Sequence, residues 1–162
     1  MNWFERLLRK YVEHKEIGWS EIGEKFTRYF LIKSRVGNVY LHQLNAPNWH
    51  PECHDHPWGF IAIILRRGYI ERTRKQDVVF GRVVNSLIDT RKRPGTILFR
   101  PAAFLHNVRT EGTSWSLILT TPKSREWGFK PCERQGMGAG EALPYDKYRA
   151  IYKGSVNIRG LK

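Results

Sequence analysis

Three histidines have the residue type and spacing to bind one metal ion. His54 and His56 flank a single residue, and side chains at positions i and i+2 of an extended strand project to the same face. A later strand could bring His106 alongside them. Three imidazole nitrogens on one face would leave other positions of the ion open to water or substrate. The alternative is an ordinary β-sandwich in which the three histidines only form hydrogen bonds.

The segment around the first two histidines resembles the first sequence motif of the cupin family. His54-Asp55-His56 is followed, after four residues, by Ile61 where the family has Glu, and after six more by Gly68. The histidines and the glycine keep the family's spacing, but the carboxylate is missing. Asp55 lies between two residues that point inward, so we expect it to point away and to bond a neighbouring backbone group or an arginine.

A second segment, about 40 residues further on, resembles the second cupin motif. Gly95, Pro101 and His106 keep the family's spacing, whereas Ala103 and Thr110 replace its usual Gly and Asn. The resemblance implies an all-β fold, a single cupin-type β-barrel (jelly roll). The longer string from CHDHPWGF to LILTTPKSREWGF is similar to small cupin proteins of bacteriophage and bacterial genomes, which supplies no substrate.

The resemblance implies that His54, His56 and His106 are the metal ligands. With Ile61 in place of the family's Glu, three neutral imidazoles would leave the ion its full +2 charge and favour an anionic chelating ligand. Three-histidine sites of this kind occur in the thiol dioxygenases among the cupins. The resemblance therefore makes Fe(II) the first expectation, and Zn, Ni, Mn or Cu stays open because imidazole accepts them all.

These residues predict a metal-dependent dioxygenase that acts on a small anionic substrate, or else a cupin that only binds a ligand or metal. The residues that carry the catalysis are not assigned. Arg67 could pair with the substrate's anionic group, although a turn residue beside Gly68 is the alternative. We expect the side chains that line the substrate site to include Trp58, Phe99 and Phe104.

The charge of the chain raises a different hypothesis. The formal net charge is +13 and the pI is near 10.1, which attracts polyanions such as nucleic acid. Residues 61–100 contain ten Lys or Arg against three acids. A nucleic-acid-binding or nucleic-acid-modifying barrel is therefore an alternative function. Its phosphate contacts would be Arg72, Arg74, Lys75, Arg91, Lys92 and Arg93.

Length and pattern indicate one domain, residues 1–162, with 41% hydrophobic residues. An amphipathic helix is predicted over 2–15 within an N-terminal extension, 1–27. The barrel is predicted over 28–122, followed by a Gly- and Pro-rich extension, 123–162. β-Branched and aromatic runs separated by turn signals predict strands at 28–34, 38–44, 59–67, 69–74, 77–84, 96–100, 104–109 and 115–121.

The cysteines and the N-terminal sequence predict the location. Two cysteines, Cys53 and Cys132, do not form a disulfide framework, and the chain shows neither a signal-peptide pattern nor a transmembrane run. We therefore expect free thiols, a cytoplasmic protein and no membrane-spanning segment. A homodimer and a monomer both stay open.

Overall fold

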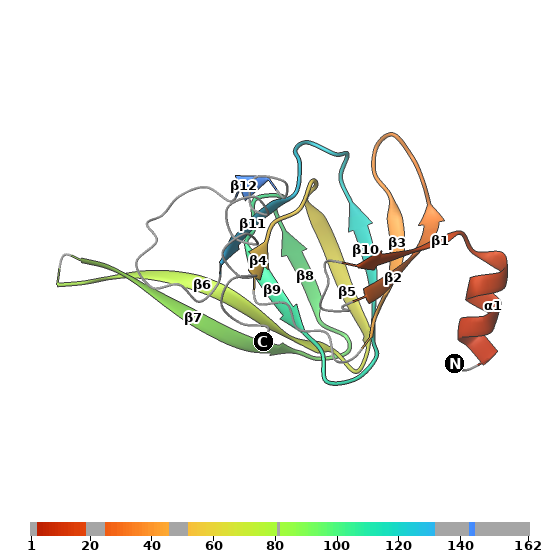
Figure 1. The fold of residues 1–162 in the computed structure, drawn as a ribbon, viewed down its shortest axis with the longest axis horizontal. Coiled ribbons are helices and arrows are strands. Elements are labelled where there is room, and N and C mark those ends of the chain that lie inside the picture. The colour runs from red at the N-terminus through yellow and green to blue at the C-terminus, as the bar shows by residue number, and fades with distance from the viewer. Residues whose placement is uncertain (1–2, 19–24, 46–51, 81, 132–142, 145–162) are drawn as a thin grey trace, which may run out of the picture.

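Two antiparallel sheets form the body of the molecule (Figure 1). The computed structural model describes residues 3–18, 25–45, 52–80, 82–131 and 143–144. One sheet has the strand order β1-β2-β3-β10-β5-β8 and the other β12-β11-β4-β9-β6-β7. The elements are α1 (Trp3–Tyr11), β1 (His14–Gly18), β2 (Lys25–Ile32), β3 (Val39–Leu44), β4 (Glu52–His54), β5 (Phe60–Arg66), β6 (Tyr69–Val79), β7 (Arg82–Lys92), β8 (Ile97–Arg100), β9 (His106–Arg109), β10 (Ser114–Thr120), β11 (Gly128–Pro131) and β12 (Leu143–Pro144).

The predicted all-β fold with an N-terminal helix is confirmed. Alternation along the strands separates an inner from an outer face, as the two-residue period of a strand requires. In β5, Phe60, Ala62 and Ile64 are buried, and the residues between them are more exposed. These three side chains form one core cluster with residues of both sheets, including Tyr69 of β6 and Ile118 of β10.

The predicted strand boundaries differ most between residues 69 and 92. The separate strands predicted at 69–74 and 77–84 are one long hairpin of two 11-residue strands, β6 and β7. Polar and charged residues run through both strands, so no apolar alternation marked their true length. Figure 1 shows this hairpin extending well beyond the rest of the barrel.

The N-terminal helix is shorter than predicted. It ends at Tyr11, and His14 begins strand β1, which pairs with β2. Leu8 and Val12 pack against a second core cluster of Tyr29, Leu41 and Trp115. The helix therefore covers one flank of the barrel, as its apolar stripe predicts, and leaves other apolar side chains, including Trp3 and Tyr11, exposed.

The structure bears on two expectations behind the predicted location: the free thiols and the lack of a membrane-spanning segment. Cys53 is disulfide-bonded, so the expected free thiol at this position is wrong and the thiol argument for a cytoplasmic location does not apply to it. Cys132 lies outside the described residues. Among the described residues, no helix combines the length and the apolar character needed to cross a bilayer.

The β5–β6 turn requires glycine at position 68. Arg67 and Gly68 both have positive φ, 60° and 77°, where the chain turns from one sheet into the other, and glycine adopts such a φ most readily. A Cβ at position 68 would lie 2.0 Å from the carbonyl oxygen of Lys92. Gly95 also has positive φ, but a Cβ there would meet nothing within 4 Å.

We predict that Gly68→Ala destabilises the protein by about 2–5 kcal/mol, because it adds a backbone clash to an unfavourable φ. Gly95→Ala, the matched control, should lose only about 1 kcal/mol from the φ alone. Urea unfolding of both variants measures the difference. Equal losses would contradict the close approach of β7 to this turn.

Candidate metal centre

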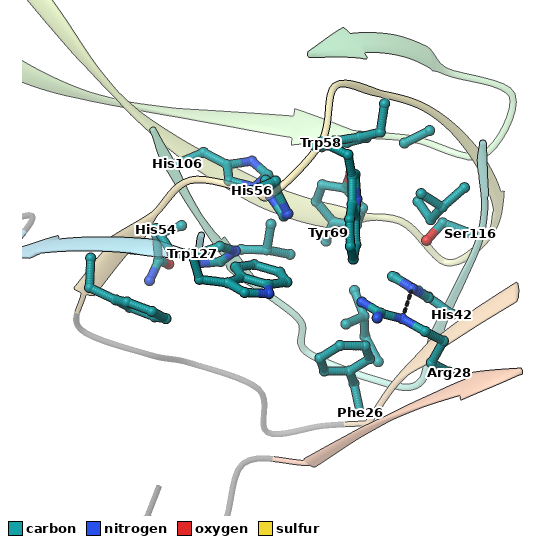
Figure 2. Close-up of a pocket in the computed structure, with 17 residues that line it drawn as sticks. Phe26, Arg28, His42, His54, His56, Trp58, Tyr69, His106, Ser116 and Trp127 are labelled. Atoms are coloured by element: carbon teal, nitrogen blue, oxygen red, sulfur yellow. Dashed lines mark hydrogen bonds between the residues drawn. The ribbon is translucent and has the colours of Figure 1, made fainter. Parts of the chain in front are cut away.

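A cavity of about 100 Å³ lies inside the barrel and is lined by residues of both sheets (Figure 2). Its walls are largely aromatic and aliphatic, and they include Trp58, Phe60, Tyr69, Trp127 and Phe129. Three histidines lie toward one end. Such a space is suited to a small, mostly apolar molecule with a few polar contacts.

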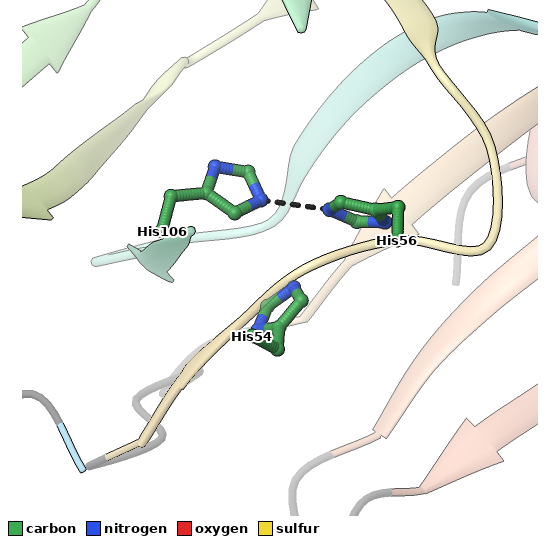
Figure 3. Close-up of side chains that lie close together, drawn as sticks. All are labelled: His54, His56 and His106. Atoms are coloured by element: carbon green, nitrogen blue, oxygen red, sulfur yellow. Dashed lines mark hydrogen bonds between the residues drawn. The ribbon is translucent and has the colours of Figure 1, made fainter. Parts of the chain in front are cut away.

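The three histidines turn their rings toward one another (Figure 3). The ring centroids of His54, His56 and His106 are 5.0–5.1 Å apart in all three pairs. One nitrogen from each ring lies within 4.8 Å of the other two. Within the described residues, the sequence prediction that these three side chains come together is therefore met.

Strand pairing explains this convergence. His54 lies directly opposite His106 in the antiparallel pair β4–β9, and directly opposed residues bring their side chains together. His56 follows two residues after His54, and its backbone N–H donates to the carbonyl oxygen of Ala102 at 3.0 Å. The convergence thus requires both the same-face spacing of His54 and His56 and the pairing with His106, which lies 50 residues after His56 in the sequence.

The donor set fits a divalent metal ion. The Nε2 atoms of His56 and His106 are 2.9 Å apart, close to the ~3 Å expected for two neighbouring nitrogens that each lie about 2.1 Å from a common ion. Burial lowers the pKa of His56 well below its usual value, and the neighbouring histidines His54 and His106 lower it further. His56 is therefore neutral at physiological pH, which is the form that binds metal.

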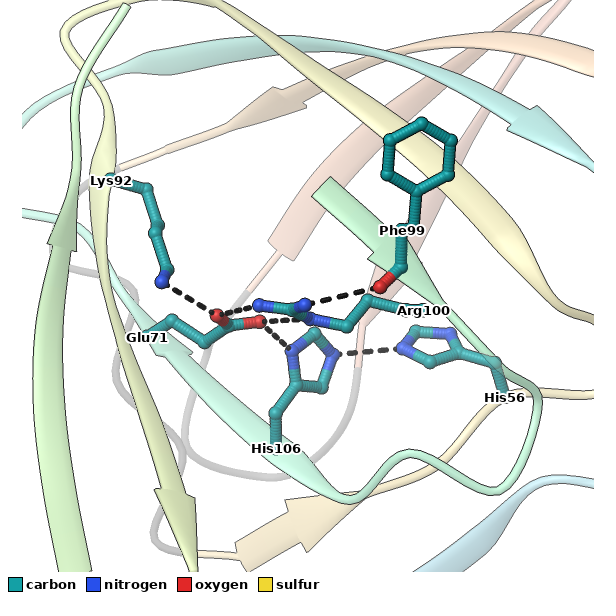
Figure 4. Close-up of polar contacts among 6 residues, drawn as sticks. All are labelled: His56, Glu71, Lys92, Phe99, Arg100 and His106. Atoms are coloured by element: carbon teal, nitrogen blue, oxygen red, sulfur yellow. Dashed lines mark hydrogen bonds and ion pairs between the residues drawn. The ribbon is translucent and has the colours of Figure 1, made fainter. Parts of the chain in front are cut away.

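Glu71 holds His106 in position from behind (Figure 4). Its Oε1 lies 2.8 Å from His106 Nδ1, so His106 directs Nε2 toward the other histidines. Arg100 donates to both carboxylate oxygens, at 3.1 and 2.6 Å, and Lys92 Nζ lies 3.3 Å from Oε2. A carboxylate behind a ligating histidine fixes its tautomer and makes it a better ligand.

Glu71 is ionised although it is only 1% exposed. Burial raises its pKa, but the hydrogen bonds and charges of His106 and Arg100 outweigh this effect and bring the pKa down to about 2. Tertiary contacts thus place a negative charge beside His106, where Arg100 and Lys92 pair with it. It acts through His106 rather than as a ligand.

The residue that faces the site at the family's glutamate position is Phe60, not Ile61. Phe60 lines the cavity, and its ring centroid lies 4.6 Å from that of His56. Ile61 lies on the opposite face of β5 and pairs with Phe99 of β8. Neither Phe60 nor Ile61 carries a carboxylate, so the site still lacks the family's acid. The residue that takes its place toward the cavity is Phe60.

Two predicted substrate contacts do not lie in the cavity. Phe99 is 69% exposed on the outer face of β8, opposite Ile61. Arg67 follows the end of β5 and is exposed, with positive φ, so it is the turn residue beside Gly68 that was the alternative.

The other two predicted contacts lie near the site. Trp58 lines the cavity. Phe104 does not, but its ring centroid lies 5.7 Å from that of His106, and it lies beneath the guanidinium of Arg100 at 4.3 Å. Phe104 therefore packs behind His106 rather than against a bound molecule.

Asp55 binds the segment at residues 125–128 to the site. Gly128 N–H donates to its carboxylate at 2.6 Å, and Arg125 forms an ion pair with it at 3.0 Å. The expectation that Asp55 points away and bonds a backbone group or an arginine is confirmed. Burial raises the pKa of Asp55, and the Gly128 and Arg125 contacts oppose that rise. β11 is thereby held against β4, and Trp127 and Phe129 line the cavity.

The predicted phosphate contacts are distributed over the β6–β7 hairpin and the turn after it. Ion pairs are formed by Arg72 with Asp89 at 2.7 Å, by Arg91 with Glu111 at 3.2 Å and by Lys92 with Glu71 at 3.3 Å. Lys92 is thus a structural partner of the metal centre, which corrects its assignment to a nucleic-acid surface. Lys75 and Arg93 are exposed, and Arg74 is partly exposed.

Arg28, His42, Trp127 and Phe129 line the cavity, and Glu71 supports His106, but the sequence patterns did not assign these residues to the site. Glu71 shares strand parity with the buried Tyr69, and an acid at a buried position within a basic segment was the available signal. Trp127 and Phe129 lie beside β4, more than 70 residues earlier in the chain, through a pairing that no local pattern encodes. His42 accepts the hydrogen bond of Arg28.

Comparison with known proteins identifies the fold. No family model matches the chain, and no curated protein matches it in sequence. The DMSP lyase DddQ from Ruegeria pomeroyi is similar in structure, with a TM-score of 0.50 at 21% identity over 84% of this chain and 62% of that one. A cupin-2 domain protein from Rhodospirillum rubrum has a TM-score of 0.53 at 14% identity over 93% of this chain and 89% of that one.

The chain has the cupin fold. The cupin barrel and the histidine cluster together make a centre that can hold a divalent metal ion. The chain spans 62% of the DMSP lyase, and at these identities the likeness concerns the fold alone.

We predict that Glu71→Gln weakens metal binding by about 10- to 100-fold, because His106 loses the charged partner that fixes its ring. Glu111→Gln is the matched control, since it removes an exposed glutamate paired with Arg91. Calorimetric titration of each metal-free variant with Zn(II), a metal without redox chemistry, measures the effect. Equal affinities would show that Glu71 does not support the centre.

Proposed function

We propose that this cupin is a metal-dependent enzyme that acts on a small organic anion, and that Fe(II)-dependent oxygenation is its reaction. The proposal depends chiefly on the convergence of His54, His56 and His106 at one end of a largely aromatic cavity. Three neutral ligands leave the charge of a divalent ion uncompensated, which favours an anionic substrate. An Fe(II) ion held there would supply open coordination positions and one-electron chemistry with dioxygen.

The protein's own residues prepare this site. Glu71 and Arg100 keep His106 oriented, and the ionised carboxylate remains in place at neutral pH because its pKa is about 2. The ring centroid of Trp127 lies 4.8 Å from that of His56, and the ring centroid of Trp58 lies 5.9 Å from that of Trp127. We expect these two rings to limit the access of water to the histidines. Excluding water strengthens the electrostatic contacts of a bound anion.

The lyase activity of DddQ makes a metal-dependent elimination the main alternative reaction. The two reactions differ in whether oxygen is consumed. They share the metal centre and the cavity, so one preparation of the protein distinguishes them.

Protein purified without a histidine tag should contain about one metal ion per chain, because three imidazoles form a complete protein ligand set. After anaerobic loading with Fe(II), a panel of small organic acids should reveal oxygen uptake. His54→Ala/His56→Ala should lose both metal and uptake. His14→Gln is the control, because His14 lies in β1, outside the cluster.

The possible results separate the functions. Absence of metal from the wild-type protein, also after loading, would overturn the metal-dependent proposal. Breakdown of an acid without oxygen uptake would identify an elimination. Bound metal without conversion of any acid would support a protein that binds a ligand or metal without catalysis.

Nucleic-acid binding remains a second candidate because of the shape of the β6–β7 hairpin (Figure 1). A two-stranded ribbon of this kind can enter the major groove of DNA. Arg74 and Lys75 lie on this ribbon, and the net charge of +13 favours polyanions. The ion pairs of Arg72, Arg91 and Lys92 reduce the number of cations available for phosphates.

If this candidate is correct, the logarithm of the affinity for duplex DNA should fall linearly with the logarithm of the salt concentration. Arg74→Gln/Lys75→Gln should reduce that slope by about 1–2, since each lost phosphate contact removes about one unit. Lys33→Gln, after β2 in the other sheet, is the control. Fluorescence anisotropy at 50–200 mM salt measures the slope, and an unchanged slope would exclude the ribbon as the interface.

A further inference from the structure

A buried arginine lies in the same cavity as the three histidines. Arg28 of β2 is 8% exposed, and it lines the cavity together with His54, His56 and His106. Figure 2 shows Arg28 and His42 at one end of the cavity and the three histidines toward the other. A molecule that fills this space would therefore meet a fixed positive charge and the metal centre.

Aromatic rings and one imidazole surround the guanidinium. Its Nε donates to His42 Nε2 at 3.0 Å. The guanidinium carbon lies 4.7 Å from the ring centroid of Tyr40, 5.4 Å from that of Trp58 and 5.6 Å from that of Phe26. Aromatic faces attract a cation but carry no formal negative charge, so the charge of Arg28 stays uncompensated.

Within the described ranges, Arg28 has no carboxylate partner, and its hydrogen bond to His42 uses only Nε. A buried charge without an opposite charge is unfavourable. The pKa of Arg28 reflects this cost, because burial lowers it to about 10, against an opposing effect of Tyr40. Arg28 therefore remains charged at neutral pH, in a place where an anionic guest would stabilise it.

We infer that Arg28 is the receptor for the carboxylate of a small organic acid that occupies this cavity. A guanidinium presents nitrogens in a planar fork that matches the two oxygens of a carboxylate. The walls, including Phe60, Ile118 and Val108, fit a short apolar body behind that carboxylate. A cavity volume of about 100 Å³ limits the acid to a small one.

His42 positions the receptor. Burial and the charge of Arg28 lower the pKa of His42 well below its usual value, so its imidazole is neutral and accepts the Arg28 hydrogen bond. This bond, with the surrounding rings, fixes the plane of the guanidinium. Arg28 thus takes the role that the sequence had suggested for the exposed Arg67.

This inference deepens the proposed function, since the far end of the bound acid would face the three histidines. The two can nevertheless fail separately. Carboxylate recognition by Arg28 requires neither a metal nor turnover, so it can be measured as simple binding.

The test compares propionate with propionamide, which has nearly the same shape but no charge. Trp58 and Trp127 line the cavity, so tryptophan fluorescence of the full chain reports binding. Propionate should bind the wild type about 10- to 100-fold more tightly than propionamide, the range expected for hydrogen bonds to a charged group. Arg28→Met should remove this preference, and Arg35→Met, which removes an exposed arginine after β2, should keep it.

Arg28→Lys gives a second measurement should Arg28→Met not fold. It retains the charge but loses the planar fork, and we expect a preference between those of the wild type and of Arg28→Met. Equal binding of propionate and propionamide by the wild type would overturn the inference without any variant. An undiminished preference in Arg28→Met would also overturn it.

Zinc content, measured on the same samples, separates the two proposals. Wild-type protein that binds zinc but shows no preference for propionate refutes the role of Arg28 and leaves the metal centre intact. Wild-type protein that prefers propionate but binds no zinc supports the role of Arg28 and refutes the metal-dependent function.

Discussion

The metal centre depends on one ionised carboxylate buried in the barrel wall. Glu71 of β6 contacts His106 of β9, Arg100 of β8 and Lys92 of β7. Since β8 belongs to one sheet and the other three strands to the second, this cluster links the two sheets beside the histidines. Removing one partner from such a buried cluster leaves an unbalanced charge, which costs about 3–5 kcal/mol. The cluster therefore fixes the barrel wall and orients His106 through the same contacts.

Glu71 does not replace the ligand glutamate of the cupin motif, which this chain lacks. With Phe60 at the position that faces the site, the three ligands carry no charge. The nearest negative charge acts through His106 and is already balanced by Arg100 and Lys92. An ion held by these histidines would thus keep an excess positive charge toward the cavity. Arg28 adds a second positive charge to the same space, so both features favour an anionic occupant.

The segment after the predicted barrel takes part in the site. Asp55 lies between two of the histidines but points away from them, and its contacts with Gly128 and Arg125 hold β11 against β4. Trp127 and Phe129 reach the cavity for that reason. The residue between the histidines is therefore needed for the wall of the cavity rather than for binding the ion.

The sequence by itself determined the all-β fold, the N-terminal helix and the identity of the three histidines. These features depend on local signals: alternation along strands, same-face spacing of His54 and His56, and two motifs in a common register. It could not settle which of Phe60 and Ile61 faces inward, because a loop precedes β5 and the parity of a strand changes with one residue. Phe99, opposite Ile61 on β8, faces outward with it, and Arg67 lies in the turn after β5.

Only the tertiary structure decided what lies around the histidines. Glu71, Arg28 and Trp127 reach the site through pairings between strands far apart in the chain, and no local pattern encodes those pairings. The charges of Glu71 and Arg28 also acquire their effect only in the folded chain. The contacts of Glu71 with His106 and Arg100 outweigh its burial and lower its pKa to about 2, whereas burial lowers the pKa of Arg28 to about 10. In the unfolded chain these two side chains are ordinary solvated ions, and folding alone makes them part of a binding site.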